Sequence, residues 1–177
     1  PRQICMLLAD ELDDFLADPA SFSATVAERE ADYLALYDLD PPYTIVDTAP
    51  PIATWPRRED ATADRVAAGD VLTGVAGSAG VHTGIARVML NLDDPTRLEP
   101  GDIMIAPSTD PSWTPMFLVA GGVVTDIGAV NTHAVIVSRE MGIPCVPSIP
   151  DATKRIPDGA TITIDGGTGT VTIDAVP

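Results

Sequence analysis

The chain has 177 residues, of which 45% are hydrophobic and 20% are charged, a composition that indicates a globular protein with one domain plus an extension. Its 26 acidic residues against 10 Lys and Arg give a formal net charge of −16, which argues against nucleic acid and against an anionic membrane surface as partners. The apolar runs are too short for a membrane span, which needs roughly 20 residues. The two cysteines form no disulfide framework, so we expect a cytoplasmic protein.

The beginning of the chain predicts helical structure. Residues 3–17 have the apolar spacing of a short strand followed by a helix from about Asp10. Asp18 before Pro19 is typical of a helix start, because Asp caps free N–H groups and proline fits the first helical position. Apolar residues at helical spacing then continue to about Tyr37.

A proline-rich segment follows, and it separates the helices from the remaining chain. Prolines break regular elements and stiffen a linker; here they are Pro41, Pro42, Pro50, Pro51 and Pro56. We therefore divide the chain into a helical lead-in segment (1–37), a Pro-rich linker or arm (38–70) and a domain (71–177). Because the first residue is Pro1 rather than methionine, we expect a processed chain or a piece of a longer one.

The third segment is β-rich and alternates with helices. Strands are expected at 71–76, 81–90, 102–106, 123–125 and 143–146, and a closing hairpin at 160–165 and 170–174. Helices are expected at 116–120 and from His133 to about Gly142. Strand, helix, strand, helix and strand between 102 and 146 predict a parallel βαβ core, and the flanking hairpins predict further β structure. The expected fold class is α/β, a three-layer β/β/α domain.

Most catalytic chemistries have no sequence support in this chain. The sequence contains neither Gly-x-Ser-x-Gly nor a nucleotide-binding glycine motif after a strand, and two scattered His and two Cys predict no metal site. Gly166–Gly169 lies between two alternating strands, which predicts a hairpin turn rather than a phosphate loop. His82 is expected on a strand surface, Trp113 and Phe117 in the core or an interface, and Cys145 as a buried, inert thiol.

His133 is the remaining candidate for chemistry. It follows a glycine turn and lies in the first turn of the expected helix, where free N–H groups and the positive helix end favour an anion such as phosphate. Imidazole is a good phosphoryl acceptor at physiological pH. Gly128 permits a tight turn, and Thr125, Asn131 and Thr132 offer hydrogen bonds to a phosphate. These residues alone are equally compatible with a purely structural His133.

Arg139 is attractive as a phosphate clamp, but its spacing argues against that role. Six residues at about 1.5 Å rise place it roughly 9 Å beyond His133 along the helix. We therefore expect a structural role near the site for Arg139 and Glu140, with Arg139 in an ion pair with an acidic residue.

A family resemblance favours the functional interpretation. The segment around His133 reads Gly128-Ala129-x-Asn131-x-His133-Ala134-Val135-Ile136-Val137-Ser138-Arg139. It resembles the phosphohistidine signature of the mobile, swivelling domain of PEP-utilising enzymes, a family that includes pyruvate phosphate dikinase, phosphoenolpyruvate synthase and rifampicin phosphotransferase. The likeness spans about residues 71–175. Ala129 replaces the second glycine of the usual pair, and Asn131-Thr132 replaces the usual Thr-Ser; both changes are compatible with an acceptor other than pyruvate.

The resemblance implies a phosphoryl carrier. An ATP-grasp module or subunit elsewhere would pass the β-phosphate of ATP to His133, and Thr125, Gly128, Ala129, Asn131 and Thr132 would support the phosphate. The domain would then swivel to an acceptor-binding domain that holds a small molecule such as a rifamycin-type alcohol or pyruvate. This chain would bind no cofactor or metal, ATP and Mg²⁺ would sit on the separate module, and the chain would be inactive alone.

Two alternatives remain at the level of sequence. The chain fits a standalone phosphocarrier subunit of a split phosphotransferase, and it also fits a non-catalytic interaction domain in which His133 is structural. The sequence does not identify the phosphate acceptor.

Overall fold

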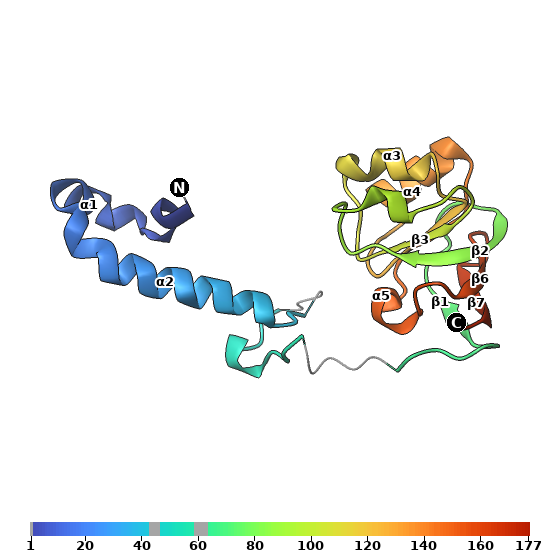
Figure 1. Cartoon of the computed structure of the whole chain (residues 1–177), viewed down its shortest axis with the longest axis horizontal. Helices are drawn as coiled ribbons and strands as arrows, with labels where there is room; N and C mark the ends of the chain where they lie inside the picture. Colours follow the sequence, from blue (N-terminus) through green and yellow to red (C-terminus); the bar gives the residue numbers. More distant parts are fainter. Residues whose placement is uncertain (1, 43–46, 59–63) are drawn as a thin grey trace. The chain divides into compact units, whose positions relative to one another are not determined.

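The computed structural model describes residues 2–42, 47–58 and 64–177 (Figure 1). The chain forms two compact units, Pro1–Thr62 and Ala63–Pro177. Residues 43–46 and 59–63 of the predicted linker lie outside the described residues. The predicted division at residues 37 and 70 stays a prediction.

The first unit is helical in its described residues. Its elements are η1 (Arg2–Met6), η2 (Ala9–Glu11), α1 (Leu12–Ala17), η3 (Pro19–Phe22), α2 (Ser23–Ala35), η4 (Leu36–Asp38) and η5 (Ile52–Thr54). The expected helix start is confirmed, because the Asp18 carboxylate accepts a hydrogen bond from the Ala20 N–H, and Pro19 opens η3. The short strand expected within residues 3–17 is wrong. That segment packs against α2 as η1, and no strand among the described residues pairs with it.

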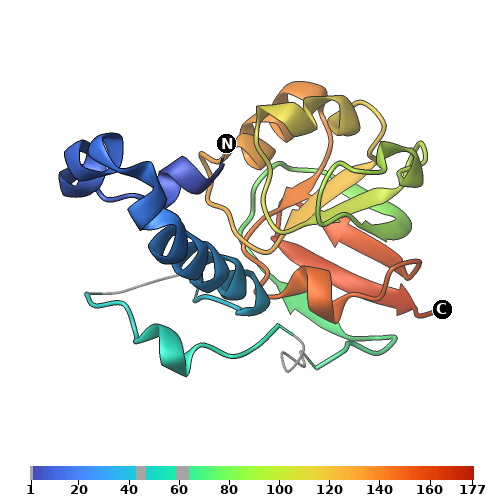
Figure 2. The same cartoon turned by 60° about the vertical axis from the view of Figure 1, so that its left-hand side comes forward.

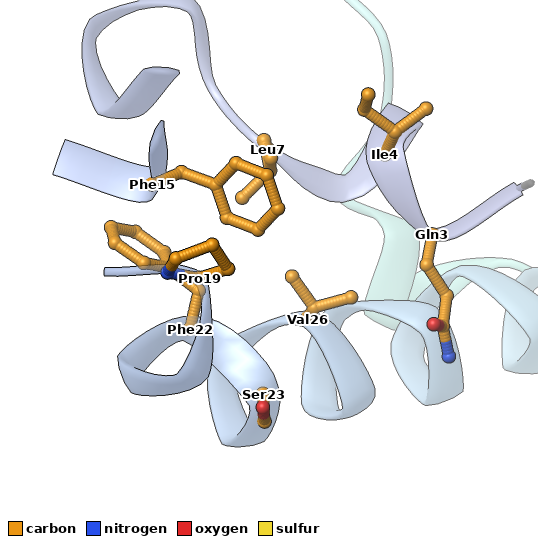
Figure 3. A pocket seen from close by; sticks show the side chains of 8 residues that line it. All are labelled: Gln3, Ile4, Leu7, Phe15, Pro19, Phe22, Ser23 and Val26. Carbon is orange, nitrogen blue, oxygen red and sulfur yellow. The ribbon is translucent and has the colours of Figure 1, made fainter. Parts of the chain in front are cut away.

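An arginine clamp holds η1 and η2 to α2. Arg29 on α2 donates two hydrogen bonds to the Glu11 carboxylate, at 2.6 and 2.8 Å, and a third to the Met6 carbonyl at 3.0 Å. Beside these elements lies a pocket of about 360 Å³, whose lining side chains are shown in Figure 3: Gln3, Ile4, Leu7, Phe15, Pro19, Phe22, Ser23 and Val26. Val26 is the only buried side chain among the described residues of this unit.

The second unit is built on one seven-stranded sheet in the order β1-β7-β6-β2-β3-β4-β5. The strands are β1 (Val71–Thr73), β2 (Val81–Val88), β3 (Ile103–Ala106), β4 (Gly122–Thr125), β5 (Cys145–Val146), β6 (Thr161–Asp165) and β7 (Thr170–Ala175). The helices are η6 (Pro95–Arg97), η7 (Pro111–Trp113), α3 (Thr114–Phe117), α4 (His133–Met141) and α5 (Ala152–Arg155). Strands β2 to β5 are parallel, and β1, β7, β6 and β2 are antiparallel. The predicted βαβ core and closing hairpin are therefore confirmed.

Two hydrophobic cores on opposite faces of the parallel strands create three layers. Successive side chains of a strand point to opposite faces. Ile103 and Ile105 of β3 accordingly enter a core shared with β6 and β7, whereas Met104 enters a core shared with the helices, including Phe117 and Val135. Figures 1 and 2 show α3 and α4 on one side of β3 and the β6–β7 hairpin on the other. The expected α/β fold in three layers is confirmed.

Several single-residue expectations concern this unit. Trp113, Phe117 and Cys145 are buried, as expected. His82 is not a simple surface residue: it is half-buried, and its Nε2–H donates to the Gly101 carbonyl at 2.7 Å. The ring occupies the space above Gly121, where a Cβ would lie 2.2 Å from Nε2. No helix in the described ranges is long and apolar enough to cross a membrane.

Candidate active site

His133 is the first residue of α4, and it lies after the loop that leaves the carboxyl end of β4. Sites in parallel α/β sheets collect at this edge. Thr132, in an extended conformation, is the N-cap of α4, and Gly142 ends the helix with a left-handed φ of 71°. The His133 side chain is half-buried, so the imidazole is both supported and accessible.

Two neighbours fix the orientation of the imidazole. The Thr109 hydroxyl lies 2.9 Å from Nδ1 of His133. The Phe117 ring meets the imidazole edge to face, with centroids 5.7 Å apart and an interplanar angle of 86°. Among the described residues nothing is hydrogen-bonded to Nε2. The imidazole therefore has one anchored nitrogen and one free nitrogen.

The loop before His133 has its carbonyl groups bound by the chain itself. Four consecutive carbonyls, from Ile127 to Val130, each accept a hydrogen bond from a side chain. The donors, in that order, are Thr125 Oγ1 (2.8 Å), Ser148 Oγ, Thr132 Oγ1 (2.8 Å) and Arg139 Nη1 (3.3 Å). These bonds leave the loop few free acceptors that would repel an anion.

Several main-chain donors of the same region are, in contrast, unpaired. The main-chain N–H groups of Asn131, His133 and Ala134 have no acceptor within the part of the chain that the structure describes. The first N–H groups of a helix are normally unpaired, and the helix end carries a partial positive charge. Bound carbonyls and free N–H groups together suit a phosphoryl group on His133.

The residues predicted to support a phosphate fall into three groups. Gly128 is required by close packing, because a Cβ there would lie 2.7 Å from Pro147 Cβ. The hydroxyls of Thr125 and Thr132 are used on loop carbonyls, so they shape the loop. Ala129 and Asn131 are exposed on the loop surface.

Arg139 has a structural role, but the ion pair expected for it does not form among the described residues. Its Nε and Nη2 donate to the Gly77 carbonyl at 3.0 and 2.7 Å, and its Nη1 reaches Val130. The reason is that α4 carries the guanidinium to the turn at Gly77, where the groups within reach are main-chain carbonyls. Glu140 is exposed near the end of α4.

Sequence reasoning missed Thr109 and Ser148 as parts of this site, and it did not single out Asp126, whose side chain bonds to Thr153. Thr109 stands 24 positions before His133, and Ser148 stands 20 positions after Gly128, so no local spacing reveals either contact. Asp126 is 8% exposed and accepts hydrogen bonds from the N–H and the hydroxyl of Thr153, at 2.8 and 2.6 Å. Burial raises the pKa of Asp126, and the bonds from Thr153 oppose that rise.

A carboxylate, Asp110, lies in the same loop as Thr109. Asp110 follows Thr109, and its pKa is lowered by the Ser112 hydroxyl, by the Ser112 N–H and, more weakly, by charge on His133. Within the described ranges no group of three or more His, Cys, Asp or Glu side chains could hold a metal ion.

Comparison with known proteins identifies the family of this site. Residues 98–169 match the family described as "PEP-utilising enzyme, mobile domain". These residues contain β3, α3, β4 and α4, and hence Thr109 and His133. The part of the chain that holds the candidate site therefore belongs to the PEP-utilising enzyme mobile domain family.

Curated relatives extend the match. A phosphoenolpyruvate synthase from Aeropyrum pernix is 40% identical over 149 residues, which cover 79% of this chain and 18% of that protein. A rifampicin phosphotransferase from Bacillus subtilis is 36% identical over 172 residues (97% and 19%). The prodigiosin synthesizing transferase PigC from Serratia marcescens is 39% identical over 156 residues (86% and 17%). The chain thus spans less than a fifth of the length of these relatives, which are larger proteins.

Proposed function

We propose that this chain is the phosphoryl-carrier domain of an ATP-dependent phosphotransferase, and that His133 carries the phosphoryl group. The observation that carries the proposal is the imidazole itself: Nδ1 is anchored by Thr109, and Nε2 has no hydrogen-bond partner among the described residues. The N–H groups of His133 and Ala134, at the start of α4, are unpaired there as well. The family match and the names of the relatives, among them a rifampicin phosphotransferase, support the same activity.

In the proposed reaction Nε2 is the nucleophile. The proposed tautomer carries its hydrogen on Nδ1, which then donates to Thr109 Oγ1 and leaves the lone pair on Nε2 available. This lone pair attacks the β-phosphorus of ATP, and AMP departs with the electrons of the broken P–O bond. Water then removes the γ-phosphoryl group as inorganic phosphate, and the β-phosphoryl group stays on Nε2. An acceptor hydroxyl finally attacks the phosphorus, loses its proton, and returns the imidazole to its starting state.

ATP and Mg²⁺ are assigned to an ATP-grasp module outside this chain, and the acceptor to a further domain. The length of the relatives leaves room for both, since more than four fifths of each relative lies outside the match. The acceptor class proposed is a small hydroxylated or enolisable molecule, such as a rifamycin-type alcohol or pyruvate.

The test uses the complete native protein and ATP labelled at the β-phosphate. Without an acceptor we expect one acid-labile, base-stable phosphate per chain on His133. With an acceptor we expect repeated release of AMP and inorganic phosphate. His133→Ala should remove the label and turnover while the melting temperature stays close to that of the wild type. His82→Ala, which removes the other histidine, is the labelling control and should keep the phosphate. Normal turnover by His133→Ala would rule out the mechanism.

A further inference from the structure

Ser148 has an unusual backbone conformation. It is one of three non-glycine residues with positive φ among those described, at 60°, together with Asp47 and Asp151. The left-handed region is disfavoured for residues with a side chain, and residues strained in this way cluster at functional sites. The Ser148 hydroxyl donates to the Gly128 carbonyl in the loop before His133.

This hydrogen bond fixes one peptide group of the loop. The carbonyl of the Gly128–Ala129 peptide faces Ser148, and its N–H faces the Thr132 hydroxyl at 3.4 Å. The Thr132 hydroxyl in turn donates to the Ala129 carbonyl at 2.8 Å. Because Thr132 is the N-cap of α4 and precedes His133, the chain of contacts runs from Ser148 to the start of the catalytic helix.

The contact also has an electrostatic consequence. A Gly128 carbonyl turned towards the imidazole would present a partial negative charge to an incoming phosphate. Ser148 holds that carbonyl against the β5–α5 loop, on the same side as Pro147, whose Cβ packs against Gly128. The N–H groups of His133 and Ala134 stay unpaired among the described residues.

We propose that Ser148 is a positioning residue for phosphoryl transfer, acting through the Gly128 carbonyl on the loop that carries His133. The inference rests on the proposed function of His133. Ser148 contacts no phosphate itself. Its hydroxyl keeps the loop in the conformation that accepts the phosphoryl group.

Substitutions at Ser148 separate the effect of its hydroxyl on the phosphorylation rate from the effect of its backbone conformation on stability. Ser148→Gly removes the hydroxyl and relieves the left-handed backbone, so its melting temperature should equal or exceed that of the wild type. Ser148→Ala removes the hydroxyl and keeps the unfavourable backbone, so it should melt lower. Both should slow phosphorylation of His133 by roughly 5- to 10-fold, the effect of one neutral hydrogen bond, with an unchanged KM for ATP. Ser148→Asn tolerates positive φ and keeps a donor, and it should recover most of the rate.

Asp151→Gly is the matched control. It relieves a second left-handed residue of the same loop, at φ 55°, without touching the Gly128 carbonyl, and should leave the phosphorylation rate unchanged.

Rapid-quench measurement of label from β-labelled ATP on the complete native protein gives the rates. Equal phosphorylation rates for the wild type and Ser148→Gly would overturn the role of Ser148 and would leave the proposed function of His133 untouched. A rate loss in Ser148→Ala that only follows its lower stability would do the same. An unlabelled wild-type protein would overturn the proposed function of His133 and this inference with it.

Discussion

The hydroxyl of Thr109 lies 2.9 Å from Nδ1 of His133, although 24 residues separate them in the sequence. Thr109 belongs to the loop between β3 and η7, and His133 opens α4, so two neighbouring crossovers of the parallel sheet meet at this contact. The Phe117 ring contacts the imidazole edge to face. The imidazole is therefore oriented by elements outside its own helix.

Loss of the Thr109 hydroxyl should impair the imidazole as a nucleophile. Thr109→Val keeps the shape of the side chain, releases Nδ1 and lets the two neutral tautomers mix. We expect the rate of His133 phosphorylation to fall roughly 5- to 10-fold, and Thr109→Ser to retain most of it. Nitrogen NMR of labelled His133 reports the tautomer directly. Thr114→Val is the control, because that hydroxyl donates to the Pro111 carbonyl and not to the imidazole. An unchanged tautomer and rate in Thr109→Val would refute this role.

Gly128 should not tolerate a side chain. A Cβ at this position would lie 2.7 Å from Pro147 Cβ and 3.2 Å from Thr132 Oγ1. Relieving this overlap costs about 1–3 kcal/mol, more than the 0.4–1 kcal/mol that Gly→Ala typically gains from the unfolded chain. Thermal or urea unfolding of Gly128→Ala should show that loss. Gly167→Ala, which meets only the Asp165 carboxylate at 3.3 Å, should be close to neutral. Equal stabilities of the two variants would contradict the packing argument.

The fold was largely predictable from sequence because its signals are local. The start at Asp18-Pro19, the end of α4 at Gly142 and the alternation of β6 each depend on neighbouring residues. The first segment was misread for the same reason. Residues 2–6 contain apolar residues suited to a strand, but the conformation is set by packing on α2, which is distant in sequence.

Only the part of the candidate site that lies in the motif around His133 was predictable from the sequence. His133 and Gly128 lie in one continuous motif and were found from it. Thr109 and Ser148 contact the motif only in the folded chain. A contact between residues so far apart in the sequence produces no recognisable spacing. The ion pair expected for Arg139 is wrong because a sequence identifies acidic side chains as candidate partners. It does not show that the fold brings the Gly77 carbonyl within reach of the guanidinium.

The two cysteines should differ sharply in reactivity. Cys5 is exposed, whereas Cys145 is fully buried, and burial raises the pKa of the Cys145 thiol to about 11. At pH 7 only about one Cys145 thiol in ten thousand would be ionised, and the thiolate is the reactive form. Iodoacetamide on the native chain should therefore label Cys5 alone by mass spectrometry, and Cys5→Ser should give no label. After unfolding in urea, Cys145 should react as well. Rapid labelling of Cys145 in the folded chain would contradict its burial.

The Glu11–Arg29 clamp predicts an acid-dependent contact in the first unit. Hydrogen bonds from Arg29 and from the Leu8 N–H lower the pKa of Glu11 from 4.5 to about 2. A carboxyl whose pKa is depressed on folding stabilises the folded state fully above pH 4.5, and this contribution is lost as the pH falls through about 2. Carbon NMR should place the Glu11 titration near pH 2, and Arg29→Gln should return it towards 4.5. Glu11→Gln should flatten the stability profile between these pH values. A Glu11 midpoint near 4.5 in the wild type would show that the clamp does not persist in solution.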